Sequence, residues 1–242
     1  MREENTETLS IIIPVYNEAL TLARVVDKIM ALELLNGLKK ELLIVNDCST
    51  DNIGEVIQTL IAKYPSMIKI MHHDLNMGKG AAIQTGIKIS TGNYIIIQDA
   101  DLEYDPSEYN LLLKPMLDGY ADVVYGSRFL GGKSHRVLFY WHTVGNKFIT
   151  FLCNIFTNLN LTDIESCYKL FRAGILKNIV LKEKRFGFEP EVTAKMARIK
   201  GIRIYETGIS YYGRTYAEGK KVEWKDGFRA LYCIIKYGLF GL

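Results

Sequence analysis

Three carboxylates follow a short apolar run at residues 94–103, Tyr-Ile-Ile-Ile-Gln-Asp-Ala-Asp-Leu-Glu. A run of this kind, rich in β-branched residues, is typical of a buried strand, which would carry Asp99, Asp101 and Glu103 to one edge of a sheet. Side chains alternate along an extended chain, so we expect all three acids on the same side of it. Their mutual repulsion favours a hard divalent cation, and Mg²⁺ usually takes one or two carboxylates and completes its shell with water and phosphate.

A helix start directly after these acids offers a structural explanation for them. Asp105, Pro106 and Glu108 fit the N-cap, first and third positions of a helix, which is a capping-box arrangement. That helix therefore has its own start signal, and the three preceding acids are not needed to cap it. The spacing favours a metal site over a purely structural role.

The composition is that of an ordinary soluble globular protein. The chain has 242 residues, of which 48% are hydrophobic and 24% charged, enough for one large α/β domain. A net charge of +3 is too small to indicate a nucleic-acid partner. The four cysteines form no C-x-x-C pair, so neither a zinc site nor a disulfide framework is indicated. Residues 1–8 lack the apolar core of a signal peptide, and we expect a disordered N-terminus and a cytoplasmic protein.

The elements that would position the acids alternate between strands and helices. We expect strands at residues 9–15, 42–45, 68–72, 121–125 and 202–206 besides the acidic one, with helices at 17–33, 52–63, 106–118 and 188–200. Residues 76–80 are expected to open a further helix that ends at about residue 89. Short connections between them predict a mostly parallel sheet with helices on both faces. In such sheets ligands bind at the carboxyl ends of strands, where residues 16–18, Asp47 and residues 99–103 all fall.

Two segments of the second half are apolar and partly basic. Residues 137–161 are too polar to span a bilayer, and they fit either a helix at a membrane interface or a helix packed on the sheet. Residues 224–242 are expected to form an amphipathic helix on a membrane surface. Gly78, Lys79 and Gly80 precede a helix, where they fit either a phosphate contact or a plain helix-start turn.

Taken in order, the motifs resemble those of family 2 nucleotide-sugar glycosyltransferases, in the branch of dolichol-phosphate mannosyltransferases and polyprenyl-phosphate glycosyltransferases. The resemblance extends over residues 9–221. The motifs are Pro-Val-Tyr-Asn-Glu (14–18), Val-Asn-Asp-Cys-Ser-Thr-Asp (45–51), Asn-Met-Gly-Lys-Gly (76–80), Asp-Ala-Asp-Leu-Glu (99–103), Gly-Ser-Arg (126–128), Asp-Ile-Glu-Ser-Cys-Tyr-Lys-Leu-Phe-Arg (163–172), Gly-Phe-Glu-Pro-Glu (187–191) and Arg-Thr-Tyr-Ala-Glu-Gly-Lys (214–220).

The resemblance implies a single GT-A domain over residues 9–223 and a set of site residues in it. A nucleotide pocket would be lined by Pro14, Tyr16, Glu18, Val45 and Asp47, although Asp47 could instead cap a helix. Asp99 and Ala100 would face the ribose and sugar, and Asp101 and Glu103 would hold Mg²⁺ or Mn²⁺. Arg128, Arg214 and Lys220 would contact phosphates. The alternative for Arg214 and Lys220 is that they lie in a basic loop exposed to solvent. Asn46, Cys48 and Glu103 depart from the common family pattern and leave the nucleotide open.

The implied reaction is inverting transfer of a hexose to a polyisoprenyl phosphate. The donor would be GDP-mannose or UDP-glucose, and the protein would sit peripherally on the cytoplasmic face of a membrane. The catalytic residues would be Asp101, Arg128, Arg214 and Lys220. The sequence leaves sugar, nucleotide, lipid length and oligomeric state open.

Two other functions fit parts of the same pattern. A saccharide acceptor would need a general base, which Asp163 or Glu165 could supply, unless Asp163 only caps a helix. A non-catalytic nucleotide-sugar-binding scaffold is disfavoured by the intact acidic and basic motifs. A dehydrogenase is disfavoured because no strand is followed by Gly-x-Gly-x-x-Gly.

Overall fold

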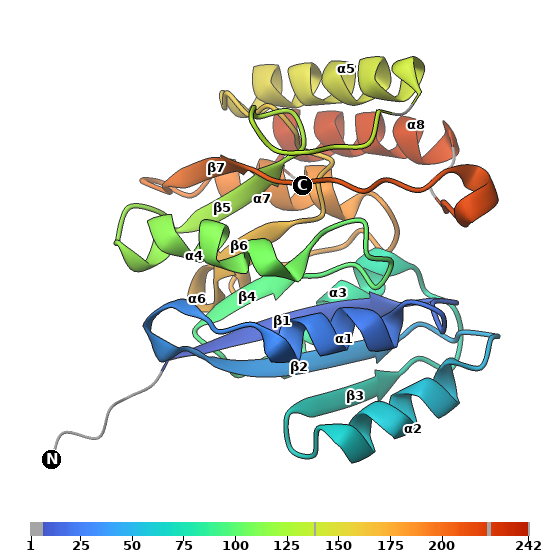
Figure 1. The fold of residues 1–242 in the computed structure, drawn as a ribbon. Helices are drawn as coiled ribbons and strands as arrows, with labels where there is room; N and C mark the ends of the chain where they lie inside the picture. Colours follow the sequence, from blue (N-terminus) through green and yellow to red (C-terminus); the bar gives the residue numbers. More distant parts are fainter. Residues whose placement is uncertain (1–6, 138, 222–223, 242) are drawn as a thin grey trace, which may run out of the picture.

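A single seven-stranded sheet forms the centre of the computed structural model (Figure 1), which describes residues 7–137, 139–221 and 224–241. The strands are β1 (Thr8–Val15), β2 (Lys39–Asn46), β3 (Ile68–His72), β4 (Tyr94–Ile97), β5 (Val123–Ser127), β6 (Lys169–Arg172) and β7 (Ile204–Gly208). Their order in the sheet is β3-β2-β1-β4-β6-β5-β7. The predicted α/β fold with a mostly parallel sheet is confirmed. The prediction of a disordered N-terminus falls almost entirely outside the described residues.

Helices pack around this sheet, with α1 and α4 in front of it in Figure 1 and α3 behind. The α-helices are α1 (Leu22–Ala31), α2 (Ile53–Lys63), α3 (Lys79–Ile89), α4 (Tyr109–Leu117), α5 (Tyr140–Thr157), α6 (Ala173–Leu176), α7 (Phe188–Ala197) and α8 (Trp224–Cys233). Short 3₁₀ turns are η1 (Leu35–Gly37), η2 (Pro106–Glu108) and η3 (Tyr216–Glu218), and η4 (Ile234–Leu239) is a π-helical stretch. Close packing of α3 on β1 depends on Gly86, where a Cβ would lie 2.4 Å from Ile12.

Strand β6 was not predicted and changes the edge of the sheet. It pairs antiparallel with both β4 and β5, whereas the other strand pairs are parallel. An antiparallel strand begins at the edge where its parallel neighbours end. Residues 163–168, which precede β6, therefore join the carboxyl ends of β1, β4 and β5.

The acidic stretch is not an extended strand, so the alternation prediction is wrong. β4 ends at Ile97, and the chain turns at residues 100–104, where Leu102 has a φ of 63°. The acids come together through this turn. The prediction that Asp105 caps the next helix is confirmed, because its side chain accepts a hydrogen bond from the Ser107 N–H at 3.0 Å.

Two other predicted helix starts differ from the structure. Helix α1 begins at Leu22, and Asn17, with a φ of 51°, accepts a hydrogen bond from the Thr50 N–H instead of capping that helix. Glu108 does not complete a capping box, because its carboxylate accepts hydrogen bonds from the backbone N–H and hydroxyl of Ser210. Both side chains tie loops together across the sheet edge.

Helices α5 and α8 lie side by side at the top of Figure 1, beyond the β5–β7 half of the sheet. Helix α5 packs chiefly against α7, α8 and η4. It therefore covers other helices, and its outer face stays exposed. The expected C-terminal helix begins at Trp224 as predicted and continues as η4.

At the opposite edge of the sheet, the buried carboxylate of Glu41 holds three segments together. It accepts hydrogen bonds from the Ser10 hydroxyl on β1, from the backbone N–H and hydroxyl of Thr91, and from Lys69 on β3. Burial raises the pKa of Glu41, but these donors outweigh that effect and lower the pKa to about 2.

We predict that Glu41→Gln lowers the free energy of unfolding at pH 7 by about 2 kcal/mol. Because the folded pKa lies below the ordinary value of 4.5, the stabilisation is complete above that value and is lost as the pH falls towards 2. Urea unfolding of both proteins between pH 7 and pH 2 measures the difference. The exposed Glu55→Gln serves as a control, and a Glu41→Gln difference that stays constant over this pH range would contradict the prediction.

Candidate active site

A cavity of about 960 Å³ opens at the carboxyl edge of the sheet. Its walls come from the ends of β1, β2, β4 and β5, from α5, and from residues 211–221, which connect β7 to α8. The predicted site residues that line it are Pro14, Tyr16, Glu18, Asp47, Asp99, Ala100, Asp101, Glu103, Arg128, Arg214 and Lys220. Val45 is fully buried inside β2 and is not among the lining residues. The structure thus brings together residues up to 206 positions apart in the chain.

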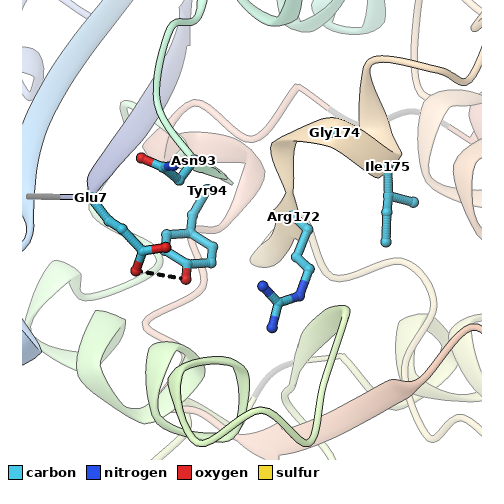
Figure 2. A pocket seen from close by; sticks show the side chains of 6 residues that line it. All are labelled: Glu7, Asn93, Tyr94, Arg172, Gly174 and Ile175. Carbon is cyan, nitrogen blue, oxygen red and sulfur yellow. Dashed lines mark hydrogen bonds between the residues drawn. The ribbon is translucent and has the colours of Figure 1, made fainter. Parts of the chain in front are cut away.

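Figure 2 shows a smaller hollow of about 270 Å³ at the other edge of the sheet. It is lined in part by Glu7, Tyr94, Arg172 and Ile175, and the Tyr94 hydroxyl donates a hydrogen bond of 2.9 Å to Glu7. The hollow lies at the amino end of β4, away from the acids. The candidate site is therefore the large cavity.

The guanidinium of Arg214 lies among three carboxylates in this cavity. Its Nη2 is 2.9 Å from Asp101 Oδ2 and 2.9 Å from Glu18 Oε1. Its backbone N–H donates to Glu103 Oε1 at 2.7 Å. The Nε atom is buried, has no hydrogen-bond partner among the residues that the structure describes, and is 3.7 Å from Glu103 Oε1. The side chain of Arg214 thus pairs with carboxylates that follow two different strands, β1 and β4.

The acids in this cluster carry more negative charge than Arg214 compensates. Burial, together with repulsion from Asp99 and Glu103, raises the pKa of Asp101, and Arg214 opposes that rise. A bound metal ion would relieve this repulsion. Oxygen ligands of this type suit Mg²⁺ and Mn²⁺.

The donor set fits a metal that takes only part of its shell from the protein. Within the described residues, no group of three acidic, cysteine or histidine side chains converges as a ready-made metal site. Asp101 and Glu103 would thus provide at most two carboxylates, as is usual for Mg²⁺ bound together with a phosphate. Both oxygens of Glu103 now accept hydrogen bonds, from the Tyr211 hydroxyl and from the Arg214 N–H. Both oxygens of Asp101 accept as well, from the Glu103 N–H and from Arg214 Nη2, so either carboxylate must give up a protein donor to bind a metal.

Lys221 was missed by the sequence analysis, which had selected its neighbour Lys220. Its ammonium lies 2.7 Å from Glu18 Oε1 and also donates to the Tyr16 carbonyl. Residues 211–221 are consequently held across the cavity by Tyr211, Arg214 and Lys221. The Lys-Lys pair in the sequence is the only signal that could have indicated this role. Lys220 itself lines the cavity, and burial lowers its pKa.

Asp47 forms hydrogen bonds with the turn that contains Gly78. The Asp47 carboxylate accepts hydrogen bonds from the backbone N–H groups of Met77 and Gly78, and one of its oxygens is 2.7 Å from His73 Nδ1. At the start of α3 the Ala81 N–H donates to the Lys184 carbonyl. The predicted helix start at residues 78–80 is confirmed, and the Gly78 N–H is already bonded to Asp47. A phosphate contact through the N–H groups of Lys79 and Gly80 stays a prediction.

Arg128 is fixed in place by a fully buried carboxylate. Its Nε and Nη2 atoms donate to the two oxygens of Asp163 at 2.6 and 2.7 Å. The guanidinium carbon is 5.1 Å from the centre of the Tyr211 ring. Asp163 is therefore neither a helix cap nor a free general base. Arg128 presents a positive charge of fixed orientation to the cavity.

Comparison with known proteins agrees with this geometry. Residues 10–180 match the model of glycosyl transferase family 2. An undecaprenyl-phosphate mannosyltransferase from Micrococcus luteus is 32% identical, with 86% of this chain and 85% of that relative covered. A dolichol-phosphate mannosyltransferase from Pyrococcus furiosus is 27% identical over 95% of this chain, which spans 64% of that relative's length.

A solved structure of glucosyl-3-phosphoglycerate synthase from Mycobacterium tuberculosis, in complex with Mn²⁺, UDP and phosphoglyceric acid, shares the fold. Its TM-score is 0.73 at 16% identity, with 96% of this chain and 79% of the other covered. The extent of the family match and the similarity to the Micrococcus enzyme together show that this chain belongs to glycosyl transferase family 2.

Proposed function

We propose that this glycosyltransferase moves a hexose, mannose or glucose, from a nucleotide-diphosphate sugar to a polyisoprenyl phosphate. The observation that carries the proposal is the cavity in which Asp101 and its neighbouring acids face Arg128, Arg214 and Lys220. Such a site can hold a cation and phosphates at the same time. The names of the Micrococcus and Pyrococcus relatives, both mannosyltransferases that act on polyprenyl-type phosphates, support the acceptor.

The charges of the cavity suit a reaction between two phosphates. When bound at Asp101, Mg²⁺ or Mn²⁺ would act as a Lewis acid on the leaving diphosphate. Arg214 then loses its role as counter-ion of the acids and becomes available to the phosphates. Arg128, already oriented by Asp163, and Lys220 offer further positive charge. A phosphate monoester carries about 1.5 to 2 negative charges at neutral pH, so the acceptor needs no strong general base. Positioning and charge stabilisation dominate.

An apolar surface beside the cavity supports a lipid acceptor. Helix α5 exposes Trp141, Phe148 and Phe151, and the adjacent α8 exposes Trp224 and Phe228. Trp141 and Trp224 also line the cavity, so the surface continues into the site. In the part of the chain that the structure describes, no helix is both long and apolar enough to cross a bilayer. We infer that α5 and α8 lie on a membrane surface, the cytoplasmic one, and admit the lipid phosphate from it.

The saccharide-acceptor alternative is less well supported. Of the two bases considered for it, Asp163 uses both oxygens to hold Arg128, which leaves Glu165. A saccharide would also leave the exposed aromatic face of α5 and α8 without a role.

We predict that Asp101→Asn lowers metal-dependent transfer by about a hundredfold or more, because it removes the charge that holds the cation. The assay offers GDP-mannose and UDP-glucose as donors, with polyprenyl phosphate or an oligosaccharide as acceptor, with and without Mn²⁺. The exposed Asp118→Asn should leave transfer unchanged. Transfer that needs no metal, or that goes to the oligosaccharide alone, would refute the proposed function.

Substitution of Arg214 should change metal binding and catalysis in opposite directions. Arg214→Gln removes the protein cation that competes for the acids, so Mn²⁺ binding without donor should tighten several-fold. Transfer should fall by about a hundredfold, because the charge is lost from the phosphates. Mn²⁺ titration followed by electron paramagnetic resonance measures the first effect.

Two variants serve as controls for this experiment. Arg214→Lys keeps the charge and should bind Mn²⁺ nearly as weakly as the natural protein. Arg203→Gln removes an arginine that is paired with Asp122 outside the cavity, and it should change neither property. Weaker Mn²⁺ binding in Arg214→Gln would show that Arg214 does not compete with the metal.

Vesicle flotation tests the membrane surface. Replacing Phe148 and Phe151 on α5 and Phe228 on α8 by Ser should reduce binding to vesicles that contain anionic lipid by about tenfold or more, because each removes buried apolar area. Tyr120 and Val180 are also exposed but lie in loops outside α5 and α8, and their replacement should have no effect. Equal flotation of all variants would contradict the proposed contact.

A further inference from the structure

A buried wall of polar side chains continues from the acidic cluster to the segment before β6. It consists of Asp99, Cys167, Glu189 and Glu165, all of which line the large cavity. The Cys167 thiol donates to Glu189 Oε1 at 2.9 Å, and Glu189 is only 3% exposed. No step described so far uses Glu165 or Glu189.

The wall contains three carboxylates, and two of them have a donor from the protein. Asp99 is 2.7 Å from the Lys79 ammonium, and Glu189 accepts from Cys167. The nearby Lys169 ammonium donates to the backbone carbonyls of Ile164 and Ser166. Glu165 Oε1, in contrast, has less than 1 Å² of accessible surface and no hydrogen-bond partner within the described residues.

A carboxylate in this position is costly to leave without a donor. Burial, reinforced by repulsion from Glu189, raises the pKa of Glu165 to about 8. Most buried polar side-chain atoms in folded proteins have at least one hydrogen-bond partner. Since Glu165 borders the cavity, a hydrogen-bond donor can reach it from a bound ligand. Rotation about its terminal torsion, which is soft, turns either oxygen towards that ligand.

The order of the strands indicates which part of a donor would lie there. Tyr16 and Asp47, at the predicted nucleotide end of the cavity, follow β1 and β2, the proposed metal ligand Asp101 follows β4, and Glu165 precedes β6. These strands lie in the order β2-β1-β4-β6 across the sheet. A nucleotide, a diphosphate and a hexose laid along this order place the hexose over the start of β6.

We propose that Glu165 and Glu189 form the subsite for the donor hexose, in which their carboxyl groups form hydrogen bonds with sugar hydroxyls. This inference rests on the proposed function and assigns the sugar-binding part of the same site. Glu165 would be the principal contact, because its Oε1 has no hydrogen-bond partner among the described residues. Its role is to bind and select the sugar, and the reaction needs no proton transfer to it.

The test compares binding of a nucleotide sugar with binding of the same nucleotide without the sugar. Calorimetry with GDP-mannose and GDP, and with UDP-glucose and UDP, all with Mn²⁺, gives the dissociation constants. Glu165→Ala should weaken binding of the preferred nucleotide sugar by about tenfold, the usual effect of losing one hydrogen bond in a buried site. Binding of the nucleoside diphosphate should change less than about twofold, since its contacts remain. Glu165→Gln, which keeps the shape, should show a smaller loss.

Glu191 provides a matched control on the same helix as Glu189. It is fully buried and accepts the backbone N–H groups of Lys182 and Glu183, but it does not line the cavity. Glu191→Gln should lower the melting temperature without changing either dissociation constant. This separates loss of stability from loss of sugar binding.

Donor analogues that lack one hydroxyl each identify the contact. If an analogue lacks the hydroxyl that Glu165 binds, the natural protein and Glu165→Ala should bind it with nearly equal dissociation constants. The comparison is a double-mutant cycle between the side chain and the hydroxyl. An unchanged affinity of Glu165→Ala for the nucleotide sugar, or an equal loss for the sugar-free nucleotide, would overturn the subsite while leaving the proposed function intact. If the natural protein binds none of these nucleotides, the proposed function fails and the subsite with it.

Discussion

Charge balance at the carboxyl edge of the sheet determines how the site is built. Glu18 follows β1, and Asp101 and Glu103 follow β4, so the fold itself brings three carboxylates to one place. Arg214 bonds to all three, and Lys221 adds a second cation at Glu18. Like charges this close in a partly buried site would repel by several kcal/mol without such partners. The position of residues 211–221 therefore depends on the acids that they neutralise.

This dependence links the contents of the cavity to the position of its covering segment. In the proposed function, a metal and a diphosphate satisfy the acids in place of Arg214, and the arginine can then move to the phosphates. Arg128 differs from it, because its bidentate pair with a fully buried Asp163 fixes it in either state. The site would thus combine one fixed arginine with one whose partners change. A segment of this kind can close over a substrate only when the substrate supplies the charge.

The antiparallel strand β6 explains why the cavity extends past the metal site. Because β6 begins at the carboxyl edge, the residues before it lie beside those that follow β4. If β6 ran parallel to its neighbours, the residues that follow it, and not those that precede it, would border the cavity. The place of Glu165 beside the acids, and of Asp163 under Arg128, follows from this one reversal.

Much of this arrangement could be predicted from the sequence, where periodicity and motif order were informative. The buried runs at 9–15, 42–45 and 94–97 marked the parallel strands, and the acids after them marked the edge. The alternation argument for Asp99, Asp101 and Glu103 was wrong because a residue with positive φ, Leu102, replaces extended chain. Such a turn leaves no periodic signal.

Contacts between distant segments were the part that the sequence could not supply. β6 was not predicted because four residues are too few to show a clear period, and its pairing with β4 and β5 depends on residues far away in the chain. The sequence predicted a site role for Lys220 and not for Lys221, because it does not show which of two neighbouring lysines faces the acids. The partners of Asp47 and Asp163 depend on tertiary packing, which converted two apparently free carboxylates into structural ones.

The central claim is that Asp101 and Arg214 exchange partners when the metal and donor bind. Crystals grown with Mn²⁺ and the nucleotide sugar, with diffraction recorded at the manganese absorption edge, test it most directly. The account predicts an anomalous peak within bonding distance of Asp101 and the diphosphate, with the Arg214 guanidinium moved from the carboxylates to the phosphates. A manganese ion bound away from Asp101, or an Arg214 that keeps its present contacts with metal and donor in place, would contradict it.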